Sequence, residues 1–176
     1  WRELIRRYQP AILWNDIGYP RQGELKQIFA DYYNQFPDGL VNNRFRQGAE
    51  EEPHYDFTTP EYARMTEITD YKWESCRGLG FSFGYNQLEG PQQVLSSNDL
   101  IEMVADITSK NGNLLLNIGP KPDGSISQIQ LNRLQELGAW LGRNGEAIFG
   151  TRPWERAEGK TSTGSPLRFT RKDGAI

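Results

Sequence analysis

The sequence has little of the chemistry from which metal sites and disulfide frameworks are built. Its 176 residues include one cysteine and one histidine. A single cysteine cannot form a disulfide within the chain, and these two residues cannot supply the four ligands of a structural zinc site. The composition therefore argues against a structural metal centre and a disulfide scaffold.

Long apolar runs and basic patches are also missing. No stretch is long and apolar enough to span a membrane. The 20 basic and 23 acidic residues are mixed along the chain, with a net charge of −3, so no basic patch indicates a nucleic-acid partner. The sequence does not begin with methionine, and a signal peptide would lie outside it, so the localisation is unknown.

The residues that are present predict a folded globular protein. Hydrophobic residues make up 36% and charged residues 24% of the chain, and this length is enough for a domain with a sizeable core. Aromatic residues reach 12%, with five tryptophans and eight tyrosines. Sugar-binding sites use such aromatic faces, but ordinary cores use them too.

The first half of the chain has the pattern of an α/β protein. A short helix at residues 1–8 ends before Pro10, and the apolar residues 11–14 predict a buried strand. Residues 23–36 have helical spacing of apolar positions, and residues 40–44 predict a second strand. The order strand, helix, strand is typical of a parallel sheet.

The second half predicts further elements and a change of domain. They are a segment at 72–85 that ends as a strand, a helix at 100–110 capped by Asn98 or Asp99, a strand at 112–119 buried on both faces, and a helix at 126–143. After Gly150 the chain changes to short polar pieces, with an isolated strand at 166–171. We therefore expect an α/β domain over residues 1–150 and the start of a β-domain over residues 151–176.

Asp16 directly follows the first predicted strand. Gly18 and Pro20 then predict a loop in place of regular secondary structure. Catalytic groups of α/β barrels lie at the carboxyl ends of strands. A turn residue or the N-cap of the next helix is the other interpretation of Asp16, and the residues alone leave both open.

A second carboxylate is required if Asp16 serves in glycoside hydrolysis. The polar stretch at residues 45–71 is long and lacks periodicity, which is typical of functional or disordered loops. Its glutamates are Glu50, Glu51, Glu52, Glu61 and Glu67. The run Glu50–Glu52 has the composition of a solvated face. Glu61 has apolar neighbours in Pro60 and Tyr62, an environment suited to a general acid.

Several motifs, in order along the chain, resemble those of the glycoside hydrolase family 29 α-L-fucosidases. W-N-D-x-G after Y-x-P, at residues 8–18, resembles the nucleophile segment, which implies that Asp16 is the nucleophile. P-H-Y-D-F-T-T-P-E-Y at residues 53–62 resembles P-H-W-D-F-x-T-x-E-Y of bacterial members. The resemblance implies that Glu61 is the general acid/base.

Two further motifs concern the sugar. V-N-N-R-F at residues 41–45 resembles V-N-D-R-W, whose arginine contacts fucose hydroxyls; here Asn43 replaces Asp and Phe45 replaces Trp. Judged from the residues alone, without the resemblance, Arg44 is equally well explained as one partner of an ion pair that holds a strand end. K-W-E-S-C followed by S-F-G-Y resembles a family signature in which the position of Phe83 packs against the C5 methyl of the sugar. Asn117, near the end of a predicted strand, lines the pocket or occupies a turn.

The resemblance implies a fold and an activity. The fold is the second half of a (β/α)8-type TIM barrel followed by the start of a C-terminal β-sandwich. The activity is that of a retaining exo-α-L-fucosidase acting on a fucosylated oligosaccharide or glycoconjugate, with no metal or organic cofactor. The implied substrate-binding residues are Trp14, Arg44, His54 and Phe83.

The resemblance also leaves two other functions open. Sugar-binding residues that precede the nucleophile in the family have no counterpart in this sequence. We therefore expect the chain alone to be inactive, or to depend on self-association or on a complementing N-terminal half. The alternatives are a non-catalytic fucose-binding barrel remnant and an inactive fragment.

Overall fold

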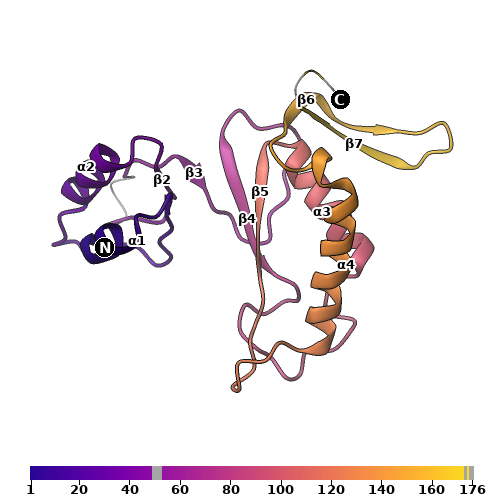
Figure 1. The fold of residues 1–176 in the computed structure, drawn as a ribbon, viewed down its shortest axis with the longest axis horizontal. Helices are drawn as coiled ribbons and strands as arrows, with labels where there is room; N and C mark the ends of the chain where they lie inside the picture. Colours follow the sequence, from indigo (N-terminus) through magenta and orange to yellow (C-terminus); the bar gives the residue numbers. More distant parts are fainter. Residues whose placement is uncertain (49–52, 173, 175–176) are drawn as a thin grey trace. The chain divides into compact units, whose positions relative to one another are not determined.

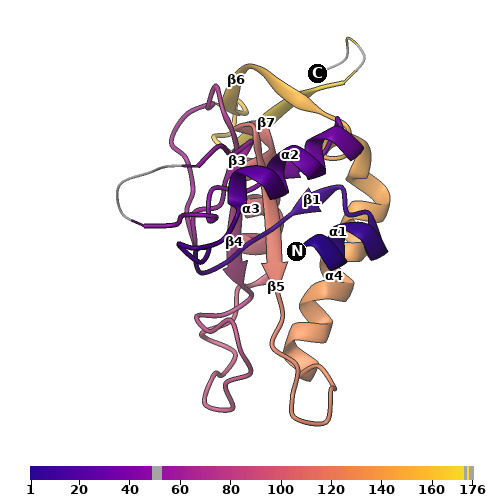
Figure 2. The same ribbon diagram turned by 90° about the vertical axis from the view of Figure 1, so that its left-hand side faces the viewer.

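The computed structural model describes residues 1–48, 53–172 and 174. The chain forms two compact units, Trp1–Thr59 and Pro60–Ile176, drawn in Figures 1 and 2. This grouping does not test the predicted division at residue 150, which stays a prediction. Among the described residues, no helix combines the length and apolarity needed to cross a membrane.

The first unit has the predicted strand–helix–strand order. Its elements are α1 (Arg2–Tyr8), β1 (Ile12–Leu13), α2 (Leu25–Gln35), β2 (Leu40–Val41) and β3 (Phe57–Thr58). Strands β1 and β2 pair in parallel, with Ile12 opposite Leu40 and Leu13 opposite Val41. The parallel pair confirms the α/β class, although both strands are shorter than predicted.

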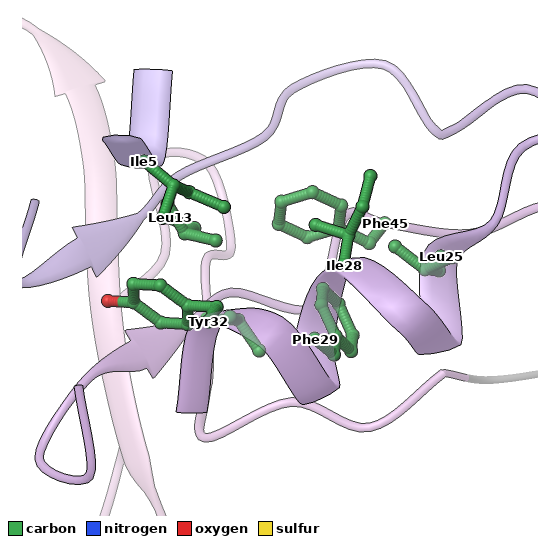
Figure 3. Close-up of a cluster of buried hydrophobic side chains, with 8 residues drawn as sticks. Ile5, Leu13, Leu25, Ile28, Phe29, Tyr32 and Phe45 are labelled. Carbon is green, nitrogen blue, oxygen red and sulfur yellow. The ribbon is translucent and has the colours of Figure 1, made fainter. Parts of the chain in front are cut away.

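The core of this unit forms around one face of α2 (Figure 3). Leu25, Ile28, Phe29 and Tyr32 follow the helical repeat and are all buried. Phe45 is fully buried among them, and its ring centroid lies 5.1 Å from that of Phe29. The replacement of Trp by Phe at this position therefore affects core packing.

The second unit places two helices on one side of a parallel strand pair (Figure 1). Its elements are β4 (Lys72–Gly78), α3 (Ser97–Ser109), β5 (Gly112–Asn117), α4 (Gln128–Asn144), the 3-10 helix η1 (Gly145–Ala147), β6 (Arg152–Lys160) and β7 (Pro166–Arg171). Strands β4 and β5 pair in parallel from Trp73–Gly112 to Gly78–Asn117. Trp73 is fully buried, and its indole N–H donates to the carbonyl of Lys110 at 3.1 Å. The core lies between this strand pair and α3.

Two predictions about individual elements were wrong for local reasons. The segment 72–85 begins, rather than ends, as a strand, because pairing with β5 stops at Gly78. Helix α3 begins at Ser97 and its N-cap is Ser96, whose hydroxyl accepts from the backbone N–H of Asp99 at 3.2 Å. The sequence had offered Asn98 or Asp99 as the cap, although serine is an equally good N-cap residue.

Two other predictions failed because pairing partners and packing faces are not visible locally. Strand β5 is not buried on both faces, since Leu115 is 40% exposed whereas Leu114 and Leu116 pack against the core. The strand predicted at 166–171 is not isolated, because β7 pairs antiparallel with β6. The hydrophobic pattern of β6 was too weak to predict a strand.

A buried charge cluster joins α3 to the β6–β7 hairpin. Asp106 is 2% exposed. Its Oδ1 accepts from Lys110 Nζ at 2.8 Å and Arg168 Nε at 2.7 Å, and Oδ2 accepts from Arg64 Nε at 3.3 Å. Lys110 also pairs with Glu158 of β6 at 2.7 Å. The salt bridges of Asp106 with Arg168 and of Lys110 with Glu158 therefore join the C-terminal half of α3 to both strands of the hairpin.

Removing the charge of Asp106 is expected to destabilise the second unit. Asp106→Asn removes a buried carboxylate that pairs with Lys110 and Arg168, and it leaves the half-exposed Glu158 as the carboxylate beside the buried Lys110 ammonium. The expected cost is about 3–5 kcal/mol in the free energy of unfolding. Urea unfolding measures the loss. Glu102→Gln, an exposed position on the same helix, is the matched control and should change stability little. Equal stability of the two variants would contradict this role.

The same cluster predicts how stability depends on pH. Burial acts to raise the pKa of Asp106, but hydrogen bonds from Lys110 and Arg168 and the charges of Lys110 and Arg64 outweigh it, so the pKa lies below 3.8. A depressed folded-state pKa stabilises the fold above the unfolded-state value and loses this contribution as pH falls through the folded-state value. Acid unfolding of the wild type should therefore be steeper below pH 3.8 than that of Asp106→Asn.

Candidate active site

Asp16 lies in a turn that immediately follows β1. Asn15 fixes this turn, because its side-chain Nδ2 donates to the carbonyls of Gly18 at 2.8 Å and Arg44 at 3.0 Å. Gly18 has φ of +75°, and a Cβ there would lie 3.0 Å from the carbonyl of Arg46, so only glycine suits the position. The carboxylate of Asp16 is 63% exposed. The structure thus places Asp16 at the carboxyl end of the parallel pair.

Arg44 brings together two of the predicted site residues. Its Nη1 donates to Asp16 Oδ1 at 2.9 Å, and its guanidinium carbon lies 4.9 Å from the ring centroid of Trp14. The other edge of the guanidinium contacts Thr59, with Nε to Oγ1 at 2.8 Å and Nη2 to the carbonyl at 2.7 Å. The structure therefore contains an ion pair of Arg44, the alternative to sugar binding that the sequence had left open. The contact of Arg44 with a sugar stays a prediction.

Three polar residues that the sequence analysis did not assign to the site support this arrangement. Asn42 is fully buried and exchanges two hydrogen bonds with the backbone of Asn15, at 3.0 and 2.8 Å. Asn43 Oδ1 accepts from both the backbone N–H and the hydroxyl of Thr59, at 3.0 and 3.1 Å. Asn42 and Asn43 directly follow β2. Their polar side chains at a strand end were the only feature of the sequence that could have indicated this supporting role.

His54 lies beside Asp56 and Tyr33 in the first unit. Its Nε2 lies 3.4 Å from Asp56 Oδ1, and its ring meets that of Tyr33 edge to face at 5.6 Å. Asp56 Oδ2 also accepts from the Tyr33 hydroxyl at 2.6 Å, and burial and this carboxylate both raise the pKa of Tyr33. His54 thus contacts Asp56 and Tyr33, and its role in substrate binding stays a prediction.

Glu61 is an exposed residue of the second unit, held by the backbone of β4. Glu61 and Cys76 form an isolated parallel bridge. In this bridge the N–H of Cys76 donates to the carbonyl of Pro60, and that of Tyr62 to the carbonyl of Cys76, both at 3.0 Å. Cys76 itself is buried, as expected for a small apolar residue.

Tyr62 connects the Glu61 segment to Phe83. It has φ of +54°, an unusual conformation for a tyrosine. Its hydroxyl donates to the carbonyl of Gly80 and accepts from the N–H of Gly78, both at 3.3 Å, and its ring lies 5.3 Å from that of Phe83. Within the second unit, the acid/base candidate and the predicted sugar-methyl contact are therefore linked through one side chain.

The loop that presents Phe83 is held by polar side chains. Asn117, at the end of β5, donates its amide N–H to the carbonyl of Phe83. Glu89 Oε1 accepts from the N–H groups of Phe81 at 2.8 Å and Ser82 at 3.0 Å. The Phe83 side chain remains partly exposed. Asn117 thus supports the loop from the last residue of β5, and its place in the lining of a sugar pocket stays a prediction.

The acidic residues in the described part of the chain do not form a metal site. Among the residues that the structure describes, no group of three or more His, Cys, Asp or Glu is arranged to hold a metal ion. Glu50, Glu51 and Glu52 lie outside the described residues.

Comparisons with known proteins identify the family. A sequence profile described as Alpha-L-fucosidase matches residues 1–146. Tissue alpha-L-fucosidase of Rattus norvegicus is 31% identical, over 99% of this chain and 39% of its own length. Plasma alpha-L-fucosidase of Homo sapiens is 34% identical, over 92% of this chain and 36% of its own. The structure of Thermotoga maritima alpha-fucosidase in complex with fucose has 50% identity and a TM-score of 0.84, over 97% of this chain and 38% of that one.

These relatives are glycoside hydrolases. The chain belongs to the alpha-L-fucosidase family, which confirms the family expected from the motifs. It spans about two fifths of the length of the relatives it matches.

Proposed function

We propose that this chain supplies the nucleophile and the acid/base of a retaining exo-α-L-fucosidase. Residues 1–150 are proposed to form the second half of the (β/α)8-type barrel, and residues 151–176 the beginning of the C-terminal β-sandwich. The parallel pairs β1–β2 and β4–β5 support the first assignment, and the antiparallel β6–β7 hairpin supports the second.

In the first chemical step, the carboxylate of Asp16 attacks the anomeric carbon of fucose. The bond to the leaving-group oxygen breaks, and Glu61 donates a proton to that oxygen. In the second step Glu61, now ionised, removes a proton from water, which attacks the anomeric carbon and releases Asp16. Two inversions give fucose with retained configuration.

The observation that best supports this proposal is the ion pair between Asp16 and Arg44 beside Trp14. An exposed carboxylate at the end of a parallel strand pair is accessible to a sugar, and the guanidinium fixes one of its oxygens at 2.9 Å. Such fixed geometry favours attack along one direction.

The proposed substrate is a terminal α-L-fucose on an oligosaccharide or glycoconjugate. Arg44 can donate to vicinal hydroxyl groups through its planar fork, and Trp14 and Phe83 offer apolar faces for the sugar. Phe83 suits the C5 methyl of a 6-deoxy sugar. His54 completes the proposed substrate-binding set as a hydrogen-bond donor or acceptor.

Trapping with a 2-fluoro-fucosyl fluoride tests the proposal, on the chain alone and on the chain supplied with a complementing N-terminal half. Attack by the nucleophile expels fluoride and forms a fucosyl-enzyme whose breakdown is slow, and peptide mass spectrometry then locates the sugar. We expect the adduct on Asp16. An adduct on another carboxylate would contradict the assignment of the nucleophile. A folded sample that binds fucose without forming an adduct would favour the non-catalytic binding protein instead.

A further inference from the structure

Thr59 lies at the centre of the hydrogen bonds around Arg44. It is 3% exposed, and both of its oxygen atoms accept from the same guanidinium, Oγ1 from Nε at 2.8 Å and the carbonyl from Nη2 at 2.7 Å. These two donors form one edge of the planar guanidinium. With Thr59 bound along that edge, the Nη1 end of the guanidinium faces Asp16.

The hydroxyl of Thr59 is itself oriented by Asn43. A hydroxyl has one proton and two lone pairs. Its proton is directed at Asn43 Oδ1, at 3.1 Å, so the lone pairs are available to Arg44 Nε and, at 3.5 Å, to Asn42 Nδ2. Asn43 also accepts from the N–H of Thr59 at 3.0 Å. The side-chain oxygen of Asn43 therefore fixes both the backbone and the hydroxyl of Thr59.

This geometry also accounts for the tolerance of asparagine where the family motif has aspartate. Only the Oδ1 oxygen of Asn43 is used in its bonds to Thr59, and an aspartate oxygen could accept the same two bonds. Asn43 binds Thr59, and Thr59 in turn binds Arg44, so the support that Asn43 gives to the guanidinium runs through Thr59.

We propose that Thr59, oriented by Asn43, is a positioning residue that sets the direction of the Arg44 guanidinium toward Asp16. Thr59 acts through Arg44 and does not itself touch the reacting atoms. The hydrogen bonds of Thr59 exist without a substrate. Only the effect of Thr59 on catalysis rests on the proposed function.

Substitutions that differ only in the hydroxyl test this role. Thr59→Val keeps the shape but removes Oγ1, Thr59→Ser keeps the hydroxyl, and Thr58→Val makes the same change at the preceding residue of β3. We expect Thr59→Val to slow trapping by 2-fluoro-fucosyl fluoride about tenfold, since a hydrogen bond to a charged group is lost. Thr59→Ser and Thr58→Val should trap at close to the wild-type rate. Equal rates for both valine variants would overturn the proposal.

A second measurement separates this inference from the proposed activity. In nuclear magnetic resonance spectra, the Nε–H signal of Arg44 should exchange slowly with water in the wild type, Thr58→Val and Thr59→Ser, and at least about tenfold faster in Thr59→Val. An unchanged Arg44 signal in Thr59→Val would overturn the positioning role. Absence of trapping in the wild type supplied with a complementing N-terminal half, together with the expected change of signal, would overturn the proposed activity and leave the positioning role supported.

Discussion

In the enzyme assembled with a complementing N-terminal half, replacing Asp16 by glycine is expected to lower kcat for 4-nitrophenyl α-L-fucoside by on the order of 10⁴-fold or more, because no covalent intermediate can form. The carboxylate is exposed, and its place in the turn depends on the backbone of the turn and on Asn15. Removal of the side chain should therefore leave the fold of the first unit intact. Circular dichroism checks this point.

Azide should partly restore activity to Asp16→Gly. The small anion fills the space of the lost carboxylate and attacks the anomeric carbon from the same face, so the product is β-L-fucosyl azide. Asp38→Gly, in an exposed turn of the same unit, is the matched control and should retain full activity. Wild-type turnover by Asp16→Gly would remove Asp16 from the role of nucleophile.

Replacing Glu61 by alanine should have an effect that depends on the leaving group. Hydrolysis of a natural fucoside, whose leaving oxygen needs a proton, should fall about 10²–10⁴-fold in kcat/KM. Reaction with fucosyl fluoride should be much less impaired in its first step, because fluoride leaves without general acid catalysis. Kinetics with both substrates on one preparation measure the difference.

The azide product again distinguishes the roles. In Glu61→Ala the fucosyl-enzyme still forms on Asp16, and azide attacks it from the opposite face, which gives α-L-fucosyl azide. Glu67→Ala changes another exposed glutamate of the same loop and should behave as the wild type. If Glu67→Ala shows the dependence on leaving group and Glu61→Ala does not, the acid/base is wrongly assigned.

The sequence by itself determined the features that depend on local pattern. The apolar spacing of Leu25, Ile28 and Tyr32 predicted α2 and its buried face. The apolar run before Asp16 predicted β1, and the family motifs predicted an alpha-L-fucosidase, which the comparisons confirm. The roles of Asp16 and Glu61 stay predictions, as do those of the four substrate-binding candidates.

Only the tertiary structure decided which polar groups meet. Arg44 lies 15 residues from Thr59 and 28 from Asp16 in sequence, and no periodicity relates positions so far apart. Packing against α3 likewise determines which face of β5 is buried. Strand β7 forms because it pairs with β6. Local patterns describe the conformation of a segment, whereas hydrogen bonds between segments exist only once the chain has folded back on itself. The support of Asp16 by Arg44 and Thr59 is therefore a property of the folded chain.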